Sequence, residues 1–410
     1  PFKFRQDSYF HYLTGFGEPD GALLLMPEHP EHKFVLFVRP RDREKETWTG
    51  RRAGPEGAME RFDADAAFNI EELPEKLPEF LENVDRLYYA FGRNNELDRR
   101  VNTVLDAVRA KVRLGVRPPT VLVDPGVILN DMRLRKTPAE LDIMRRAAAI
   151  TREAHAEAMR FVKPGMYEYE VEGAIEYFFR RHGAAAPGYS TIVGSGVNAT
   201  ILHYVENDME CKDGDLLLID AGAEYRGYSA DITRTFPVNG KFTPAQRELY
   251  EVVLDAQLKS IEQVRAGKSF IAYHEAAVQA LVEGMVRLGI MKGEVETIIK
   301  EETYKPYYMH RTGHWLGMDV HDLGDYRVGE DWRKLEPGMV LTVEPGLYFA
   351  EDMDEVPEKY RGIGIRIVDD ILVSEGDPEN LTAGTPKTVK EVEAVMAEEP
   401  RMVVDLAPIA

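Results

Sequence analysis

Apolar positions in the second part of the chain recur at three-, four- and seven-residue steps, the spacing of an amphipathic helix. The clearest run begins at Thr137-Pro138-Ala139-Glu140, where threonine is a good N-cap, proline suits the first helical turn and glutamate completes a capping box. We therefore expect a long helix from this point to Lys163-Pro164-Gly165. Further helices are expected over residues 168–182, 244–266 and 272–288.

The first third of the chain has a different pattern. Short apolar runs at 22–26 and 34–38 alternate with helix-like stretches at 70–83 and 97–113, which indicates a small α/β domain. After it, the helices are separated by strand-like runs, which indicates an α+β domain. A length of 410 residues favours more than one core, and we place the two domains at residues 1–132 and 133–400.

Two apolar runs of the second domain match one another. Residues 213–222 align with residues 337–346, with the glycines and the terminal carboxylates, Asp220 and Glu344, in step. Each run is followed by a second predicted strand, at 228–236 and 364–373. This alignment suggests a unit built of two related halves.

Strands 216–220 and 229–235 are predicted to form a hairpin that turns at Tyr225-Arg226. That register places Asp220 directly opposite Asp231, with Cβ atoms about 5 Å apart. Two carboxylates so close repel one another unless one is protonated or a cation lies between them. The alternative is that one aspartate is a turn residue at the strand end and never faces the other.

Three histidines, His310, His314 and His321, lie within twelve residues. The spacing of the first two would suit zinc on a helix, but Arg311 stands where the helical zinc motif has a glutamate, and Gly313 favours a looped backbone. A single histidine is often a hydrogen-bonded core residue. Three in one short segment are more typical of a functional site.

In their order along the chain, these motifs resemble those of the Xaa-Pro aminopeptidases, the aminopeptidase P family. The matching segments are 202–204, 218–222, 231–236, 310–321, 342–346 and 362–366, with 12–16 and 48–52 in the N-terminal part. The resemblance covers nearly all of the chain. It implies a creatinase-like α/β domain, followed by an α+β catalytic domain with the pita-bread fold that holds two divalent ions, usually manganese.

The resemblance also implies roles for individual residues. The implied metal ligands are Asp220, Asp231, His314 and Glu344. The implied catalytic and substrate-binding groups are His203, His310, His321, Glu344 and Arg366. Trp48 matches a tryptophan that reaches a neighbouring subunit's active site in tetrameric relatives, so it is expected to contact substrate in a homodimer or homotetramer.

One position departs from the family pattern. Family members carry a second glutamate that bridges both ions, two residues after the arginine that matches Arg366, and this chain has Val368 there. Asp369 points to the opposite face of a strand, and Asp370 lies roughly 7 Å along it, so neither is a simple replacement. We expect weaker binding of at least one ion and reduced peptidase activity.

The composition narrows the choice of partner and compartment. A formal net charge of −20 argues against nucleic acid as the main partner. The single cysteine, Cys211, and the absence of any stretch of ~20 apolar residues predict a cytoplasmic protein without membrane spans. The expected substrates are peptides with proline in second position. The alternatives are a prolidase that cleaves Xaa-Pro dipeptides and a metal-poor protein that binds peptides without hydrolysis.

Overall fold

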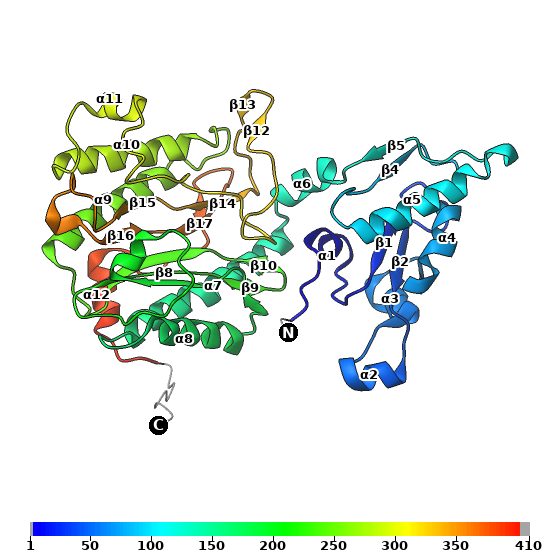
Figure 1. Cartoon of the computed structure of the whole chain (residues 1–410), viewed down its shortest axis with the longest axis horizontal. Helices are drawn as coiled ribbons and strands as arrows, with labels where there is room; N and C mark the ends of the chain where they lie inside the picture. Colours follow the sequence, from blue (N-terminus) through cyan, green and yellow to red (C-terminus); the bar gives the residue numbers. More distant parts are fainter. Residues whose placement is uncertain (1–2, 402–410) are drawn as a thin grey trace. The chain divides into compact units, whose positions relative to one another are not determined.

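The computed structural model describes residues 3–401, and the chain divides into two compact units, residues 1–129 and 130–410 (Figure 1). The boundary predicted at 132/133 lies within helix α6 (Gly126–Leu134), which begins in the first unit and ends in the second. No helix within residues 3–401 is long and apolar enough to cross a membrane.

The first unit is built on a three-stranded sheet in the order β1-β2-β3, with β1 and β2 antiparallel and β2 and β3 parallel. The apolar runs at 22–26 and 34–38 form β1 (Ala22–Leu25) and the central, buried β2 (Phe34–Val38), as predicted. The remaining strands are β3 (Ala66–Asn69) and the parallel pair β4 (Arg86–Tyr88) and β5 (Val121–Val123). The helices are α1 (Ser8–Thr14), α2 (Arg43–Thr49), α3 (Gly54–Phe62), η1 (Ile70–Glu72), α4 (Leu73–Phe80), α5 (Asn95–Arg109) and η2 (Val112–Leu114).

The long helix of the second unit, α7 (Pro138–Phe161), begins where the capping box predicts. The backbone N–H of Glu140 donates to Thr137 Oγ1, and the Glu140 carboxylate accepts from the backbone N–H of Thr137 at 2.8 Å. The other predicted helices are also confirmed, except that α9 ends five residues early. They are α8 (Glu168–Arg181), α9 (Pro244–Ile261) and α10 (Ala272–Arg287), joined by η3 (Gly196–Thr200), α11 (Val295–Lys300), η4 (Glu358–Tyr360) and α12 (Val389–Met396).

The strands of the second unit lie between two layers of helices (Figure 1). Buried residues of α7 and α8 pack on β7 and β8, whereas those of α9 and α10 pack on β15 and β16. The sheet orders are β11-β8-β7, β10-β9-β6, β14-β17-β18, β15-β16 and β12-β13. Their bounds are β6 (Ala186–Pro187), β7 (Ile192–Ser195), β8 (Leu216–Ala221), β9 (Ala223–Tyr225), β10 (Tyr228–Ser229), β11 (Ile232–Pro237), β12 (Arg327–Val328), β13 (Asp331–Trp332), β14 (Val340–Val343), β15 (Gly346–Phe349), β16 (Ile363–Arg366), β17 (Asp369–Leu372) and β18 (Glu379–Asn380).

The hairpin that carries the two aspartates forms, but its predicted register is wrong. Asp220 pairs with Thr233, not with Asp231, because the turn is centred on Arg226 and Gly227, whose φ angles are 51° and 82°. A two-residue hairpin turn of this kind needs positive φ at both central residues. The observed partner of Asp220 lies two residues from the predicted one, so Asp220 and Asp231 still point to the same face of the sheet. Their carboxylates are diagonal neighbours rather than directly opposite.

The second half repeats this arrangement. β14 pairs with β17 up to Val343 opposite Asp369, and β15 pairs with β16 from Gly346 opposite Arg366. These two registers place Glu344 across from Val368. The single strand predicted at 364–373 is thus divided at 367–368 into β16 and β17.

Candidate active site

Most of the sequence-predicted site residues line one cavity of about 570 Å³ in the second unit. They are His203, Asp220, His310, His314, His321, Glu344 and Arg366. Asp231 adjoins this group through its contact with His314. Trp48, in contrast, lies on α2 of the first unit and is 83% exposed.

The two aspartates share a hydrogen-bond donor that the sequence did not indicate. The hydroxyl of Tyr189 lies 2.6 Å from Asp220 Oδ1 and 3.0 Å from Asp231 Oδ1. Burial, and then the two carboxylates, raise the pKa of Tyr189 well above its ordinary value, so the phenol stays protonated. Tyr189 belongs to the segment between β6 and β7, which carries no recognisable motif, and only the fold brings it to the site.

His314 joins the first half of the catalytic unit to the second. Its Nε2 atom lies 3.5 Å from Asp231 Oδ2 and 3.5 Å from Glu344 Oε1. Burial lowers the pKa of His314, but the two carboxylates outweigh this effect and raise it to about 9. Burial raises the pKa of Glu344 to about 7. The carboxylates therefore favour a positive charge between them, whether a proton or a metal ion.

Thr342 holds His314 and Glu344 in place. Its Oγ1 accepts from the backbone N–H of His314 at 3.0 Å and donates to Glu344 Oε1 at 3.1 Å. Gly313, the residue before His314, lies against the backbone of Thr342. A Cβ atom added to Gly313 would be 1.9 Å from the Thr342 carbonyl oxygen. The segment that carries the three histidines is looped, so the helical zinc motif is absent, as predicted.

Arg366 lines the cavity next to Asp220 and is backed by the buried Tyr348. Arg366 Nη2 donates to Asp220 Oδ2 at 2.7 Å, and Nη1 donates to the Tyr348 hydroxyl at 3.2 Å. The same hydroxyl lies 2.9 Å from His310 Nε2. Burial, and then Arg366, lower the pKa of His310 to about 4, so its imidazole is neutral near pH 7.

His321 lies at the exposed side of the cavity, and its ring centroid is 4.4 Å from that of His314. The next residue, Asp322, is buried and accepts from Arg133 and, at 3.1 Å, from Lys136. This ion cluster anchors the loop that carries His321.

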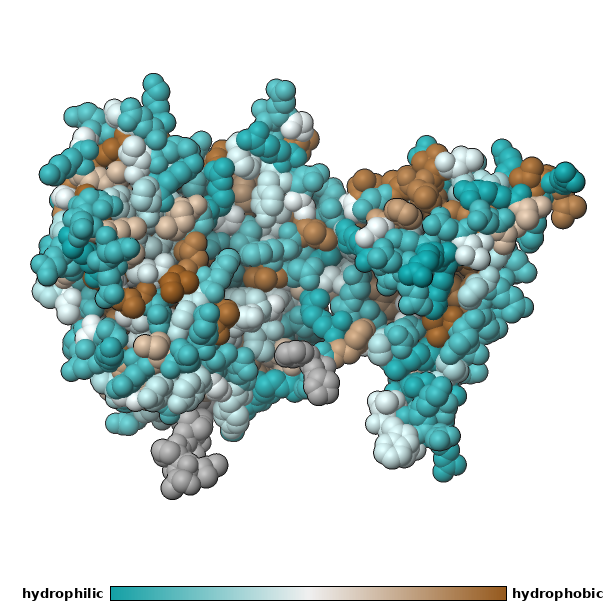
Figure 2. All heavy atoms as spheres, viewed as in Figure 1, coloured by the Kyte–Doolittle hydropathy of each residue, from teal (hydrophilic) through white to brown (hydrophobic). Residues whose placement is uncertain are grey.

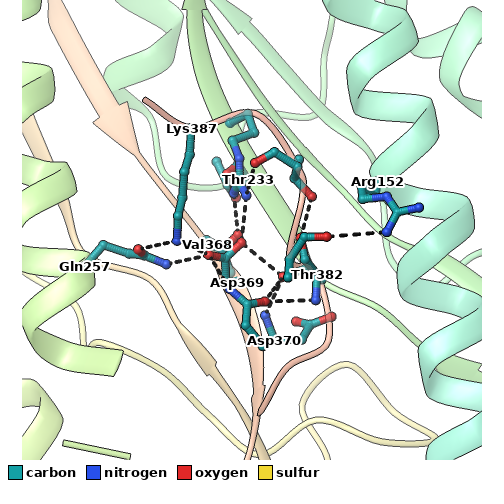
Figure 3. Close-up of polar contacts among 12 residues, drawn as sticks. Arg152, Thr233, Gln257, Val368, Asp369, Asp370, Thr382 and Lys387 are labelled. Atoms are coloured by element: carbon teal, nitrogen blue, oxygen red, sulfur yellow. Dashed lines mark hydrogen bonds and ion pairs between the residues drawn. The ribbon is translucent and has the colours of Figure 1, made fainter. Parts of the chain in front are cut away.

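Val368 is buried and lies where the two halves meet. Its backbone N–H donates to the Thr233 carbonyl at 3.1 Å, and its own carbonyl accepts from Arg234 Nη1 at 2.6 Å (Figure 3). Residues 366 and 370 share its face of the strand. Arg366 reaches Asp220 from this face, and Asp370 Oδ2 accepts from the backbone N–H of Asp231 at 3.1 Å. The valine side chain therefore occupies the face that carries the carboxylates.

Neither neighbouring acid takes the place of the missing glutamate. Asp369 points to the other face, where its carboxylate accepts five hydrogen bonds (Figure 3). The donors are Arg234, Gln257, Asn380, Thr382 and Lys387. Asp370 is buried, and its Oδ1 has no hydrogen-bond partner among the described residues. Burial, and then Asp231, raise the pKa of Asp370 well above the ordinary value.

The donor set fits a divalent metal ion in its chemistry, since it consists of carboxylate oxygens and an imidazole nitrogen. Asp231, His314 and Glu344 are spaced as ligands of one ion could be. Asp220 is instead held by Arg366 and Tyr189. Within residues 3–401, no three His, Cys, Asp or Glu side chains lie close enough together, as they stand, to hold a metal ion.

Comparison with known families agrees with this geometry. The model of metallopeptidase family M24 matches residues 142–375, and that of the aminopeptidase P N-terminal domain matches residues 1–88. The chain belongs to metallopeptidase family M24. It is a metallopeptidase of the Xaa-Pro aminopeptidase type, and the predicted fold, an N-terminal α/β domain before a pita-bread domain, is confirmed.

Similar M24 proteins match over nearly the whole chain. The Xaa-Pro aminopeptidase of Escherichia coli is 49% identical, covering 96% of this chain and 89% of that protein. Human Xaa-Pro aminopeptidase 3 is 36% identical, and the match covers 97% of this chain and 78% of that protein. The structure of the Pseudomonas aeruginosa aminopeptidase PepP has a TM-score of 0.95 at 49% identity, and the match covers 97% of this chain and 90% of that chain. Zinc-substituted E. coli aminopeptidase P in complex with product has a TM-score of 0.93 at 49% identity, covering 96% and 90%.

Proposed function

We propose that this chain releases the N-terminal residue from peptides with proline in second position, and that Val368 limits its turnover. The observation that carries the proposal is the gathering of Asp220, Asp231, His314 and Glu344 around one cavity in a chain 49% identical to an Xaa-Pro aminopeptidase. Solved structures of a similar aminopeptidase contain substrate or product, and one of them contains zinc.

The inner end of the cavity supplies the metal ligands and a proton carrier. Asp231, His314 and Glu344 would hold one ion, and Asp220 would contribute to the site of a second. When bound, divalent ions activate water and polarise the scissile carbonyl. Glu344 has a pKa near neutrality because of its burial, so it can accept the proton of the attacking water and pass it to the leaving proline nitrogen.

The histidines and Arg366 bind and orient the substrate. Neutral His310 and the hydroxyl of Tyr348 form a pair of hydrogen-bonding groups beside the carboxylates, and Arg366 fixes the hydroxyl. His310 Nδ1 donates to the Arg311 carbonyl at 2.8 Å, so its Nε2 accepts from the Tyr348 hydroxyl. Turned toward a bound peptide, that hydroxyl would stabilise the negative charge that develops on the carbonyl oxygen. His203 and His321 line the cavity, where they contact the peptide.

Val368 weakens the second ion. A glutamate there would face Asp220, Asp231 and Glu344 from the same side of the strand and would supply one more negative charge and two oxygens. Valine supplies neither, and the guanidinium of Arg366 already balances Asp220. We therefore infer that the first ion, manganese in our proposal, binds well and that the second binds weakly.

Two other functions use the same cavity. A prolidase would cleave Xaa-Pro dipeptides, and substrate length separates it from an aminopeptidase. A metal-poor protein that binds peptides without cleaving them is favoured by two features. Position 368, where the family resemblance implies a glutamate, is a buried valine, and Arg366 is paired with Asp220.

We also propose that the enzyme is a cytoplasmic homodimer or homotetramer in which Trp48 contacts a neighbour's substrate. Trp48 is largely exposed on α2. The same unit exposes further apolar side chains, which gather over β4 and β5 in Figure 2. The exposed apolar residues of these two strands are Tyr88 on β4 and Val121 and Leu122 on β5. Exposed apolar patches of this kind often mark protein interfaces. Sedimentation analysis tests the assembly.

The direct test is release of free leucine from three peptides by the manganese-dialysed chain and by Val368→Glu. The proposal expects cleavage of Leu-Pro-Gly, little cleavage of Leu-Ala-Gly, and faster turnover in the variant. Cleavage of the dipeptide Leu-Pro in preference to Leu-Pro-Gly would favour the prolidase. If Val368→Glu binds peptide but cleaves none of the three, the chain is a binding protein.

A further inference from the structure

One wall of the catalytic cavity is aromatic. Phe270, Tyr326 and Trp332 all line the cavity and pack on one another. The centroid of the Phe270 ring is 4.9 Å from that of Tyr326 and 6.3 Å from that of Trp332. This wall offers a flat apolar surface to a bound peptide.

One cation lies on this wall. The guanidinium of Arg311 is 5.6 Å from the centroid of the Trp332 ring, and Arg311 is exposed and lines the cavity. Within residues 3–401 it forms no ion pair with a carboxylate. Arg327 stacks on the same ring at 4.4 Å but is not one of the described residues that line the cavity.

The other charged side chains at the cavity already have partners. Arg366 is paired with Asp220, and the remaining carboxylates, Asp231 and Glu344, adjoin His314. The cavity thus has carboxylates around His314 and, at Arg311, a guanidinium that forms no ion pair among residues 3–401.

We propose that Arg311 binds a carboxylate of the substrate, an inference that rests on the proposed peptidase function. The α-amino group of a peptide is positive and its C-terminal carboxylate is negative. With the peptide in the cavity, its carboxylate is favoured beside Arg311, where a guanidinium binds it with two parallel hydrogen bonds. The carboxylate comes either from the C-terminus of a short peptide or from an acidic side chain.

The consequence is a preference among Xaa-Pro peptides. Short free-acid peptides and peptides with Asp or Glu bind better than neutral ones. Peptides that place a Lys or Arg side chain beside Arg311 bind worse, because like charges repel. Salt weakens both effects, since Arg311 is exposed.

The experiment measures the Kd of three uncleavable peptides by calorimetry with the manganese-dialysed chain. All three have the scissile amide reduced to CH2–N, and they correspond to Leu-Pro-Gly, Leu-Pro-Gly amide and Glu-Pro-Gly amide. Each is titrated into the unchanged chain, into Arg311→Gln and into the matched control Arg327→Gln, which removes the other arginine on Trp332.

We expect Arg311→Gln to weaken binding of at least one of the two carboxylate-bearing peptides roughly three- to fivefold, as for an exposed ion pair, and to leave the neutral amide unchanged. If Arg311→Gln weakens binding of the Leu-Pro-Gly analogue, the partner of Arg311 is the C-terminal carboxylate. If it weakens binding of the Glu-Pro-Gly amide analogue, the partner is an acidic side chain. Arg327→Gln should alter none. If Arg311→Gln changes the Kd of all three peptides equally, or if both variants change Kd equally, the proposed role of Arg311 is wrong, but the proposed peptidase function stands. Failure of every peptide to bind would overturn both.

Discussion

Arg366 Nη2 donates to Asp220 Oδ2 at 2.7 Å, and both side chains are nearly buried. This ion pair sets the charge of the metal site. With Glu344 ionised and both His314 and Asp370 neutral, Asp220, Asp231 and Glu344 supply three negative charges and Arg366 one positive charge, so the net charge is about −2. Such a site balances one divalent ion. A glutamate at position 368 would supply the charge that a second ion needs.

Tyr189→Phe tests the donor shared by the two aspartates. Loss of the hydroxyl leaves Asp220 Oδ1 and Asp231 Oδ1 without this hydrogen bond and free to rotate. Groups that orient metal ligands typically contribute about 10- to 100-fold in affinity or activity. We expect manganese affinity, measured by calorimetry, to fall by this order. Tyr169→Phe, at an exposed position, is the control and should change nothing.

Gly313→Ala tests the packing beneath His314. The added Cβ would collide with the Thr342 carbonyl oxygen, and Thr342 holds both His314 and Glu344. We expect the free energy of unfolding to fall by about 1–3 kcal/mol or more, with a loss of metal affinity. In the control, Gly173→Ala, the new methyl group on helix α8 meets no atom within 4 Å. That variant should gain up to about 1 kcal/mol in urea unfolding, because alanine favours helix. Equal effects of the two substitutions would contradict this account.

Asp369→Asn tests the polar cluster behind Val368. The substitution removes the negative charge between the buried Arg234 and Lys387, whose Nη2 and Nζ atoms each lie 2.7 Å from the carboxylate. We expect a loss of about 3–5 kcal/mol in the free energy of unfolding, as for other buried pairs. Asp354→Asn, at a 96% exposed carboxylate paired with Arg361, should have little effect. A loss of similar size in both would show that burial is not the cause.

Two buried histidines should lower stability on acidification below about pH 6.5, whereas Glu344 and Asp370, whose pKa values are raised, act in the opposite direction. Burial lowers the pKa of His155 to about 4, and burial followed by Arg311 does the same for His274. Between about pH 6.5 and 4 the unfolded chain binds more protons at these sites than the folded chain does, so each contributes a loss of up to about 1.4 kcal/mol per pH unit. Urea unfolding between pH 7.5 and 5 measures the slope. His155→Gln should flatten it, whereas the exposed His182→Gln should not.

The sequence was informative where local rules decide the structure. The capping box at Thr137 and the apolar spacing after it located α7 to the residue, since these contacts lie within one turn of helix. The carboxylates and histidines were identified from motifs, and the fold brings them to one cavity.

Features that depend on tertiary contact were missed. The turn at Arg226-Gly227 lies one residue later than predicted because arginine adopts a positive φ there, which its residue type does not indicate. Tyr189 reaches the site from a segment without a motif, and Thr342 lies in the motif 342–346 but was not predicted to hold His314. Arg366 was predicted as a site residue, but its pairing with Asp220 follows only from the paired strands.

The central claim is that Val368 leaves a site for one firmly bound ion. The most direct measurement is manganese per chain after dialysis, by elemental analysis, for the unchanged chain, for Val368→Glu and for Val368→Leu as a control of similar size without a carboxylate. The account predicts about one ion in the unchanged chain and in Val368→Leu, and about two in Val368→Glu. Two ions already held by the unchanged chain, or no gain in Val368→Glu, would contradict it.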